Sequence, residues 1–408
     1  MAISLQGACL STRAAAEAYI GGVCFKLGPP ELIGAELEWL TVCADSDCRR
    51  PSPATLAAAL GPHAPRTVAP SSPARPLPRG SYITIEPGGQ IELSSLPFAS
   101  ADELSSALTA DTEVLHRRLA AHGITCLAQS ADADRRPERI LTAPRYRAME
   151  ALFASIGPFG TMMMCNTAAT QVSVDAGADA HDVAARWRAV NAIGPALLAA
   201  FACSPSLHGA SAGWASQRMR TWLHLDPSRT AVPASAEPVT AYARWALDVP
   251  LLCVVGEPGG EWSAPGNASF ADWLDGTLDD VLDRRPTQAD LDYHLTTLFP
   301  PVRAAGHLEI RYVDAQPADG WKVPVAVLDS LMADQDSVAA ATRLAEPTAH
   351  RWFDAAHQGL RDAELRETAV GLLELAADRV RSAEAKQLVL AAVQRCRTGS
   401  IPTVQNLR

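Results

Sequence analysis

Short segments that alternate between apolar and acidic residues constrain the fold of this chain most. In the segment 32–42, Glu36 and Glu38 are two residues apart and are flanked by Ala35 and Leu37. Successive side chains of a β-strand point to opposite faces of the sheet. A strand over 32–42 would therefore place both acids on one face and the apolar side chains on the other.

Three more segments predict strands. The segment 82–94 alternates on both sides of a Pro-Gly-Gly turn, and 167–175 and 307–313 also alternate. The polar residues that share parity within these segments are Glu86, Gln90 and Glu92 around the turn, and Glu309 and Arg311 in the last one. The pattern predicts a sheet with one apolar face and one charged face.

Helical patterns surround these strands. We expect helices over 10–25, with Ser11 or Thr12 near the N-cap, over 102–123 and 181–202, and over much of the chain after residue 325. The proline-rich segment 61–80 predicts a surface loop. Because few strand segments are continuously apolar, an antiparallel or mixed sheet fits better than a doubly wound parallel one. The predicted class is α+β, with a catalytic region over 1–330 and a C-terminal helical region over 331–408.

Composition excludes several classes of protein. Thirty-five Lys and Arg residues against 45 Asp and Glu residues give a net charge of −10, which argues against a general nucleic-acid binder. The most apolar stretch, 189–203, contains Gly194 and Pro195 and is too short to span a bilayer. No signal peptide is evident, and the nine scattered cysteines form no CxxC motif. We expect a cytoplasmic protein with reduced thiols and no membrane partner.

The charged face predicts a chemistry. Acids side by side repel one another and need a counterion, and carboxylate oxygens without His or Cys clusters select Mg²⁺ or Mn²⁺. Arginines on the same face then favour metal–nucleotide phosphoryl transfer. Each of the three segments that contain glutamates (32–42, 82–94 and 307–313) alone also fits a solvated strand, a simple turn or a surface ion pair. The three segments together favour a metal site.

Two familiar motifs do not explain the chain. Gly209-Ala-Ser-Ala-Gly213 matches the GxSxG pattern of a nucleophile elbow, but a loop-like segment precedes it where a strand is required. The sequence has no GxxxxGK[ST] motif, so a P-loop cannot hold ATP here.

Seven segments in a fixed order resemble the glutamate–cysteine ligase family, in the branch shared by plant enzymes and the actinobacterial enzyme of the ergothioneine pathway. The likeness runs from about residue 33 to about residue 325, and the C-terminal helices resemble the family less. The segments are Ile33–Glu38, Ile85–Ser94, Pro144–Met149, Met162–Asp175, Trp245–Pro250, His294–Pro300 and Leu308–Arg311.

The resemblance implies an ATP-dependent ligase that joins the γ-carboxylate of L-glutamate to the amine of L-cysteine through γ-glutamyl phosphate, for ergothioneine biosynthesis. It also implies a glutamine-synthetase-like fold, a curved and mainly antiparallel sheet with ATP and Mg²⁺ (or Mn²⁺) in its funnel, in a monomer or weak dimer. The site residues that it implies are Glu36, Glu38, Glu86, Glu92 and Glu309 for metal, Arg145, Arg218 and Gln171 for substrate, Arg303 and Arg311 for ATP, and Arg311 with Glu309 for catalysis.

Two alternatives remain open at the level of sequence. The first is a γ-glutamyl ligase for a different amine, because the sequence does not define the acceptor pocket. The second is an inactive homologue that binds an amino acid or a metal, although every acidic position and Arg311 are present.

Overall fold

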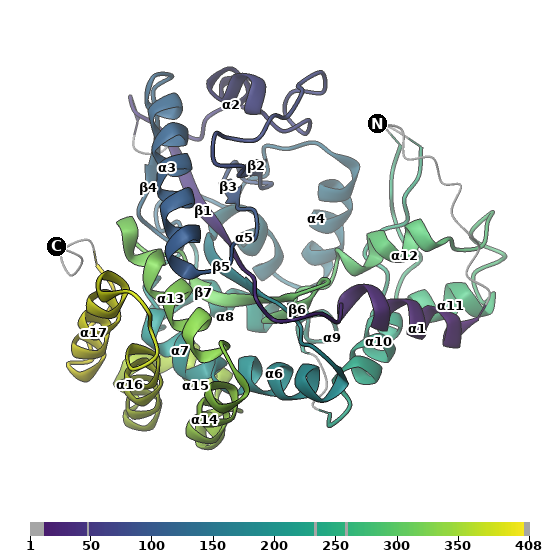
Figure 1. Ribbon diagram of the computed structural model, residues 1–408. Helices are drawn as coiled ribbons and strands as arrows, with labels where there is room; N and C mark the ends of the chain where they lie inside the picture. Colours follow the sequence, from purple (N-terminus) through teal and green to yellow (C-terminus); the bar gives the residue numbers. More distant parts are fainter. Residues whose placement is uncertain (1–11, 47–48, 232–234, 258–259, 404–408) are drawn as a thin grey trace.

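One antiparallel sheet forms the centre of the computed structural model, which describes residues 12–46, 49–231, 235–257 and 260–403. The strands lie in the order β2-β3-β1-β5-β7-β6, and β4 pairs with β1 beyond this path (Figure 1). Each of these pairings is antiparallel, which confirms the predicted α+β class with a mainly antiparallel sheet. The strands are β1 (Ile33–Cys43), β2 (Tyr82–Ile85), β3 (Ile91–Ser94), β4 (Ile124–Leu127), β5 (Ala169–Val174), β6 (Val302–Ala304) and β7 (Leu308–Asp314).

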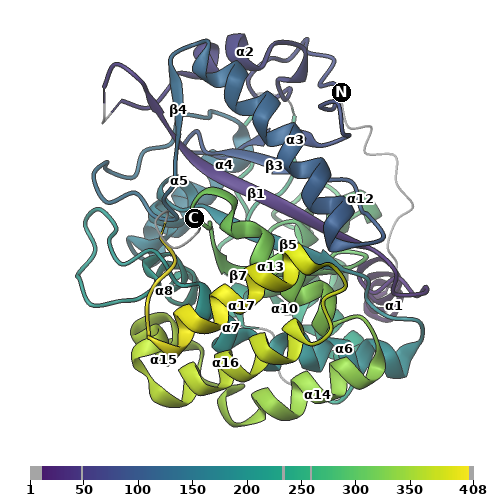
Figure 2. The same ribbon diagram turned by 60° about the vertical axis from the view of Figure 1, so that its left-hand side comes forward.

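The apolar face of the sheet is the floor of the main hydrophobic core. Ala35 and Leu37 of β1, like the apolar residues of β3, β5 and β7, are almost completely buried. Three helices pack on this region: α3 (Ala101–Ala120), α7 (Gly194–Phe201) and α13 (Lys322–Leu331). Figure 2 shows α3 and α13 in front of β1 and β5. Burial of this face determines which side chains of each strand point into the core, so the acids of β1 must point to the opposite face of the sheet.

Local signals in the sequence explain several helix boundaries. Thr12 caps α1 (Arg13–Cys24) by accepting a hydrogen bond from the backbone N–H of Ala15 (3.2 Å). The predicted helix over 181–202 is two helices, α6 (Ala180–Ala192) and α7, because Gly194-Pro195 interrupts it. A Cβ on Gly194 would lie 2.1 Å from the indole of Trp352, so this junction needs glycine for close packing.

The remaining α-helices complete the shell around the sheet. Before α13 they are α2 (Pro53–Leu60), α4 (Pro144–Ile156), α5 (Phe159–Asn166), α8 (Gln217–Leu225), α9 (Pro227–Thr230), α10 (Pro238–Asp248), α11 (Phe270–Asp275) and α12 (Gln288–Leu295). Toward the C-terminus they are α14 (Gln335–Ala345), α15 (Trp352–Gln358), α16 (Ala363–Ala377) and α17 (Ala383–Arg397). Short 3-10 turns lie at Gly61–His63, Ala318–Trp321, Glu346–Thr348 and Gly359–Arg361.

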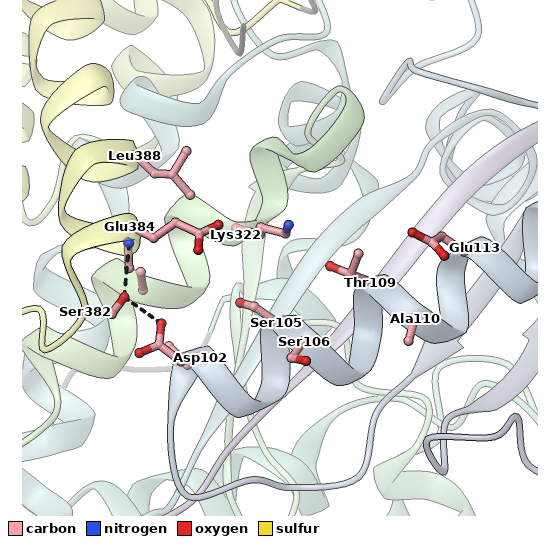
Figure 3. Close-up of a pocket in the computed structure, with 13 residues that line it drawn as sticks. Asp102, Ser105, Ser106, Thr109, Ala110, Glu113, Lys322, Ser382, Glu384 and Leu388 are labelled. Atoms are coloured by element: carbon pink, nitrogen blue, oxygen red, sulfur yellow. Dashed lines mark hydrogen bonds between the residues drawn. The ribbon is translucent and has the colours of Figure 1, made fainter.

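The C-terminal helices share the hydrophobic core of the sheet. α16 packs against α7 and α13, and α17 packs against α13 and α16. Where α17 meets α3, Ser382 donates a hydrogen bond to Asp102 (2.8 Å) and accepts one from the backbone N–H of Ala385 (3.1 Å) beside an open cavity of about 450 Å³ (Figure 3). The predicted boundary at residue 330 therefore falls at the end of a helix, α13, that contacts both regions.

Candidate active site

The charged face of the sheet forms the floor of a cavity of about 490 Å³. Helices α4, α5 and α8 and the region around α12 supply its walls. Eight of the ten predicted site residues line it: Glu36, Glu38, Glu86, Glu92, Arg145, Gln171, Arg303 and Arg311. The other two, Glu309 and Arg218, are buried next to the floor, 2% and 1% exposed. Segments separated by up to 275 positions in the sequence thus meet in one cavity, while the roles of the individual residues stay predictions.

Strand register brings the polar side chains together. Glu38 on β1 lies directly opposite Glu92 on β3, and Glu36 lies opposite Gln171 on β5. At the other end of the sheet, Arg303 on β6 lies opposite Glu309 on β7. Side chains that face each other across an antiparallel pair are separated by only about 5 Å at Cβ. The sheet therefore arranges these residues as a continuous polar surface.

Four glutamates, Glu36, Glu38, Glu86 and Glu92, form what we term the carboxylate group. Their hydrogen-bond donors are neutral: Gln171 Nε2 donates to Glu38 Oε1 (2.8 Å), and the hydroxyls of Ser94 and Thr84 donate to Glu36 and Glu92. None of the four has an arginine, lysine or histidine nitrogen of a described residue within ion-pair distance. The carboxylate group thus gathers negative charge that its direct contacts do not neutralise.

The acidity of the carboxylate group reflects this arrangement. Burial and then the neighbouring carboxylates raise the pKa of Glu36 and of Glu92 to about 8, and burial followed by Glu86 raises that of Glu38 to about 7. Burial also raises the pKa of Glu86, against the opposing charges of nearby arginines. A cation bound among these side chains would favour their ionised forms.

Glu309 has the opposite environment. Arg303 Nε donates to Glu309 Oε2 (2.7 Å), and Arg311 Nη1 donates to Glu309 Oε1. Although burial alone would raise its pKa, these two arginines lower the pKa of Glu309 to about 2. Arg311 retains a buried Nε without a hydrogen-bond partner among the described residues. Because Arg311 lines the cavity, its guanidinium suits an anionic ligand such as a phosphoryl group.

Arg145 lies at the wall of the cavity, on the first turn of α4. Its guanidinium donates to the hydroxyl (2.6 Å) and the carbonyl (2.8 Å) of Thr296 and lies 5.3 Å from the ring centroid of Tyr293. These contacts connect α4 to the end of α12. They hold the positive charge of Arg145 at the cavity wall, where it can attract a substrate carboxylate.

Arg218 is not among the residues that line the cavity. It lies behind the floor, where Nη2 donates to the carbonyl oxygen of Arg311 (2.6 Å) and Nη1 is 3.9 Å from Oδ1 of Asp314. The predicted direct contact of Arg218 with the substrate therefore has no support in this arrangement, and the contact stays a prediction.

Sequence reasoning missed several residues around the floor. Trp222 on α8 lines the cavity, and its ring centroid lies 5.1 Å from Arg218 Cζ and 5.7 Å from Arg311 Cζ. Thr84 on β2 shares the parity of Glu86 and Glu92, so its alternation with the apolar residues of 82–85 was a usable signal. For Trp222, no spacing in the sequence marks its proximity to β7.

Other sequence features have a structural place away from catalysis. The GxSxG segment 209–213 is a loop that neither follows a strand nor forms a strand–helix elbow. The seven cysteines in the described part of the chain are all free, and Cys9 and Cys48 lie outside the described residues. Among the described helices, none has the length and apolar character that crossing a bilayer requires.

The model of the glutamate–cysteine ligase family 2 (GCS2) matches residues 32–402. The chain belongs to this family. The match extends beyond residue 325, where the likeness read from the seven segments ends, and includes the C-terminal helices.

Curated members of the GCS2 family resemble the chain over most of its length. It is 37% identical to the glutamate–cysteine ligase EgtA of Mycolicibacterium smegmatis, over 94% of this chain and 89% of the relative. It is 38% identical to EgtA of Mycobacterium tuberculosis, over 91% and 84%. The chloroplastic glutamate–cysteine ligase of Brassica juncea is 31% identical over 58% of this chain and 46% of its own length. The predicted kinship with the branch shared by plant and actinobacterial enzymes is confirmed.

A solved structure confirms the fold of this GCS2 member. The crystal structure of a glutamate–cysteine ligase from Francisella tularensis in complex with AMP superimposes with a TM-score of 0.55 at 13% identity. The superposition covers 91% of this chain and 82% of that one. At this identity the likeness concerns the arrangement of the sheet and helices.

The carboxylate group has the chemistry of a site for Mg²⁺ or Mn²⁺. Its donors are carboxylate oxygens, and the buried Oε1 of Gln171 beside Glu38 has no hydrogen-bond partner among the described residues. Hard divalent cations prefer such oxygen ligands. Across the described ranges, no three His, Cys, Asp or Glu side chains are already arranged to hold a metal ion. The donor set fits the cation, and the side chains would have to move together to bind it.

Proposed function

We propose that this cavity ligates the γ-carboxylate of L-glutamate to the amine of L-cysteine, with ATP as the second substrate and γ-glutamylcysteine, ADP and phosphate as products. One observation carries the proposal: a single sheet face of a GCS2 family member places four carboxylates without ion-pair partners beside two arginines in a cavity of about 490 Å³. The names of the EgtA relatives and the AMP bound to the Francisella enzyme support the substrates. We further propose that the product supplies ergothioneine biosynthesis.

The chemistry requires two steps. A carboxylate is a poor acylating agent. An oxygen of the γ-carboxylate of glutamate therefore first takes the γ-phosphoryl group of ATP, which gives γ-glutamyl phosphate and releases ADP. The amine of cysteine then attacks the acyl carbon, the phosphate leaves with the bonding electron pair, and the amine loses a proton. The second step forms the amide bond and regenerates the site.

The residues of the chain divide between these tasks. Arg311, which lines the cavity, would donate to the phosphoryl group as charge develops on its oxygens. Arg303 on β6 would contact the phosphates of the nucleotide, and Arg145 on the wall would hold a carboxylate of glutamate; both residues line the cavity. Planar guanidinium groups suit such oxyanions better than lysine would.

The carboxylate group and Gln171 would hold Mg²⁺, which supplies charge neutralisation for the nucleotide phosphates when it is bound. The residues themselves define where this charge is needed: Glu36, Glu38 and Glu92 have raised pKa values, whereas Glu309 is already neutralised by arginines. Hence Glu309 fits the role of orienting Arg303 and Arg311 as well as the predicted role of metal ligand.

The deciding experiment measures ADP release from the purified protein with Mg²⁺, ATP, L-glutamate and L-cysteine, with each component omitted in turn. We expect release to depend on all four and the mass of γ-glutamylcysteine to appear. Hydroxylamine in place of cysteine should trap the acyl phosphate as a hydroxamate. Turnover with another amine but not with cysteine would assign a different acceptor, and no glutamate-dependent ADP release would leave an inactive homologue.

A further inference from the structure

A fully buried carboxylate lies behind the floor of the cavity. Asp314, at the end of β7 and 0% exposed, follows Arg311 by three residues. Its Oδ2 accepts hydrogen bonds from the backbone N–H of Cys203 (2.9 Å) and the hydroxyl of Ser204 (2.7 Å), and its Oδ1 accepts one from the hydroxyl of Ser216 (2.8 Å). Asp314 therefore fastens both ends of the loop between α7 and α8 to the strand that carries Arg311.

Arg218 connects this carboxylate to Arg311. Its Nη1 lies 3.9 Å from Asp314 Oδ1, its Nη2 donates to the carbonyl of Arg311 (2.6 Å), and its backbone N–H donates to the hydroxyl of Ser204 (3.2 Å). Arg218 is 1% exposed. Among the described residues, Asp314 provides the carboxylate that lies within ion-pair distance of its guanidinium. A buried guanidinium that loses its counterion is forced to move or to attract water.

Trp222 continues the connection into the cavity. Its indole N–H donates to the carbonyl of Phe299 (2.9 Å), which fixes the ring. The guanidinium groups of Arg218 and Arg311 both lie against that ring, at 5.1 and 5.7 Å from its centroid. A shift of Arg218 would therefore disturb Arg311 at its backbone carbonyl and at the aromatic ring that its guanidinium contacts.

We propose that Asp314 is a positioning residue for catalysis: it anchors Arg218, and through Arg218 and Trp222 it fixes Arg311 at the cavity floor. This inference rests on the proposed function, in which Arg311 contacts the transferring phosphoryl group. It also gives Arg218 a role that differs from direct binding of glutamate. A small displacement of a group that acts in the transition state lowers the rate more than it lowers binding of the ground state.

The test compares two buried aspartates. Asp314→Asn keeps the shape of the side chain but removes its charge. It also places an amide NH₂ group, which cannot accept a hydrogen bond, opposite groups that now donate to the carboxylate. Asp111→Asn is the matched control, because Asp111 on α3 is also 0% exposed and accepts the backbone N–H groups of Arg79 (2.8 Å) and Ser81 (3.1 Å) but does not line the cavity. We expect both variants to melt at a lower temperature than the wild type.

Only Asp314→Asn should affect catalysis. Measured at a temperature where both variants are folded, its kcat for glutamate-dependent ADP release should fall about tenfold or more, with the KM values for ATP and glutamate within about threefold of wild type. Asp111→Asn should keep kcat within about twofold. Equal kcat values in the two variants would overturn the inference, since loss of stability alone would then explain Asp314.

A milder pair of variants covers the case in which Asp314→Asn does not fold. Ser204→Ala removes one hydrogen bond to Asp314 and the acceptor of the Arg218 backbone N–H. The control Ser337→Ala removes a buried hydroxyl that accepts from Arg379 Nε (2.8 Å) on another part of the molecule. We expect kcat to fall about threefold in Ser204→Ala and to stay unchanged in Ser337→Ala. An unchanged kcat in both would count against the anchor.

A measurement without turnover separates this inference from the proposed function. The Nε–H signal of Arg311 in a ¹⁵N-resolved NMR spectrum, assigned from its absence in Arg311→Lys, should shift in Asp314→Asn and stay in place in Asp111→Asn. A silent wild-type enzyme with this shift would reject the proposed function and keep the anchor. An active wild type whose Arg311 signal is the same in both variants would reject the anchor alone.

Discussion

The two ends of the cavity floor use the same residue type in opposite ways. On β1 and β3, Glu36, Glu38 and Glu92 have neutral hydrogen-bond donors and raised pKa values. On β7, Glu309 binds Arg303 and Arg311 and has a pKa lowered to about 2. One sheet face thus separates an end that lacks positive charge from an end where positive charge is built in. The comparison teaches that a cation must come from outside at the first end, whereas the second can bind an anion directly.

Removal of the Glu309 charge should give the largest effect. In Glu309→Gln the two arginines lose a shared buried counterion, so we expect the free energy of unfolding to fall by about 3–5 kcal/mol. ADP release should fall by about 10²–10³-fold, because Arg311 would no longer be held in place. Denaturant unfolding and steady-state kinetics measure both values. Wild-type stability in this variant would show that the arginine end is not an ion-paired unit.

Binding of Mg-ATP should stabilise the carboxylate end. A ligand at 100 times its dissociation constant adds about 2.7 kcal/mol to the free energy of unfolding, and here it also relieves repulsion among the glutamates. We expect the melting temperature to rise with Mg-ATP and to rise less with ATP and EDTA. Differential scanning calorimetry with Ca²⁺-free buffers makes the comparison. Identical melting curves with and without Mg-ATP would argue against a metal–nucleotide site.

Neutralisation at the carboxylate end should stabilise the protein while it impairs catalysis. Glu92→Gln can still accept the hydrogen bond of Thr84 but removes one repelling charge, so without metal the free energy of unfolding should rise by about 1 kcal/mol at pH 8. The Mg²⁺ concentration needed for half-maximal activity should increase. Glu113→Gln is the control, because Glu113 is 65% exposed on α3, and it should change stability by less than about 0.5 kcal/mol. A destabilised Glu92→Gln protein would show that the charge of Glu92 is compensated in the folded protein, as the charge of Glu309 is.

The contrast between the two ends was only partly predictable from the sequence. Alternation placed Glu36 and Glu38 on one face, and the Pro-Gly-Gly turn placed Glu86 and Glu92 nearby, because a period of two is a local property of the chain. The pairing of Glu309 with Arg303 depends on β6, a strand of three residues that is too short to show a period. Local pattern therefore predicted the acids but not which of them would be neutralised.

The burial of Arg218 shows the same limit for the fold. Arg218 itself matches an arginine of the family, yet its position behind the cavity floor depends on Asp314 and on the loop between α7 and α8, more than ninety residues away from Asp314 in sequence. Likewise, β4 completes the sheet beside β1 although the segment 124–127 has only four residues. Contacts between distant segments decide such features, and a single sequence does not display them.

A pH titration should reveal the smallest difference between the two ends. Folding raises the pKa of Glu36 and of Glu92 from about 4.5 to about 8, so in this range the folded protein binds more protons than the unfolded chain. The stability that these groups contribute is complete below pH 4.5 and is lost as the pH rises through 8. Without metal, the free energy of unfolding should therefore fall by about 1 kcal/mol between roughly pH 7.5 and pH 8.0, and less in the double variant Glu36→Gln, Glu92→Gln. Glu309 contributes with the opposite sign, since its lowered pKa makes its stability disappear only as the pH falls toward 2. Excess Mg²⁺, which competes with protons for the carboxylate group, should flatten the slope of the wild type more than that of the double variant, which keeps Glu38 and Glu86. Equal slopes in the two proteins without metal would mean that the carboxylates titrate independently of folding, and the charge difference between the ends of the floor would then have no energetic consequence.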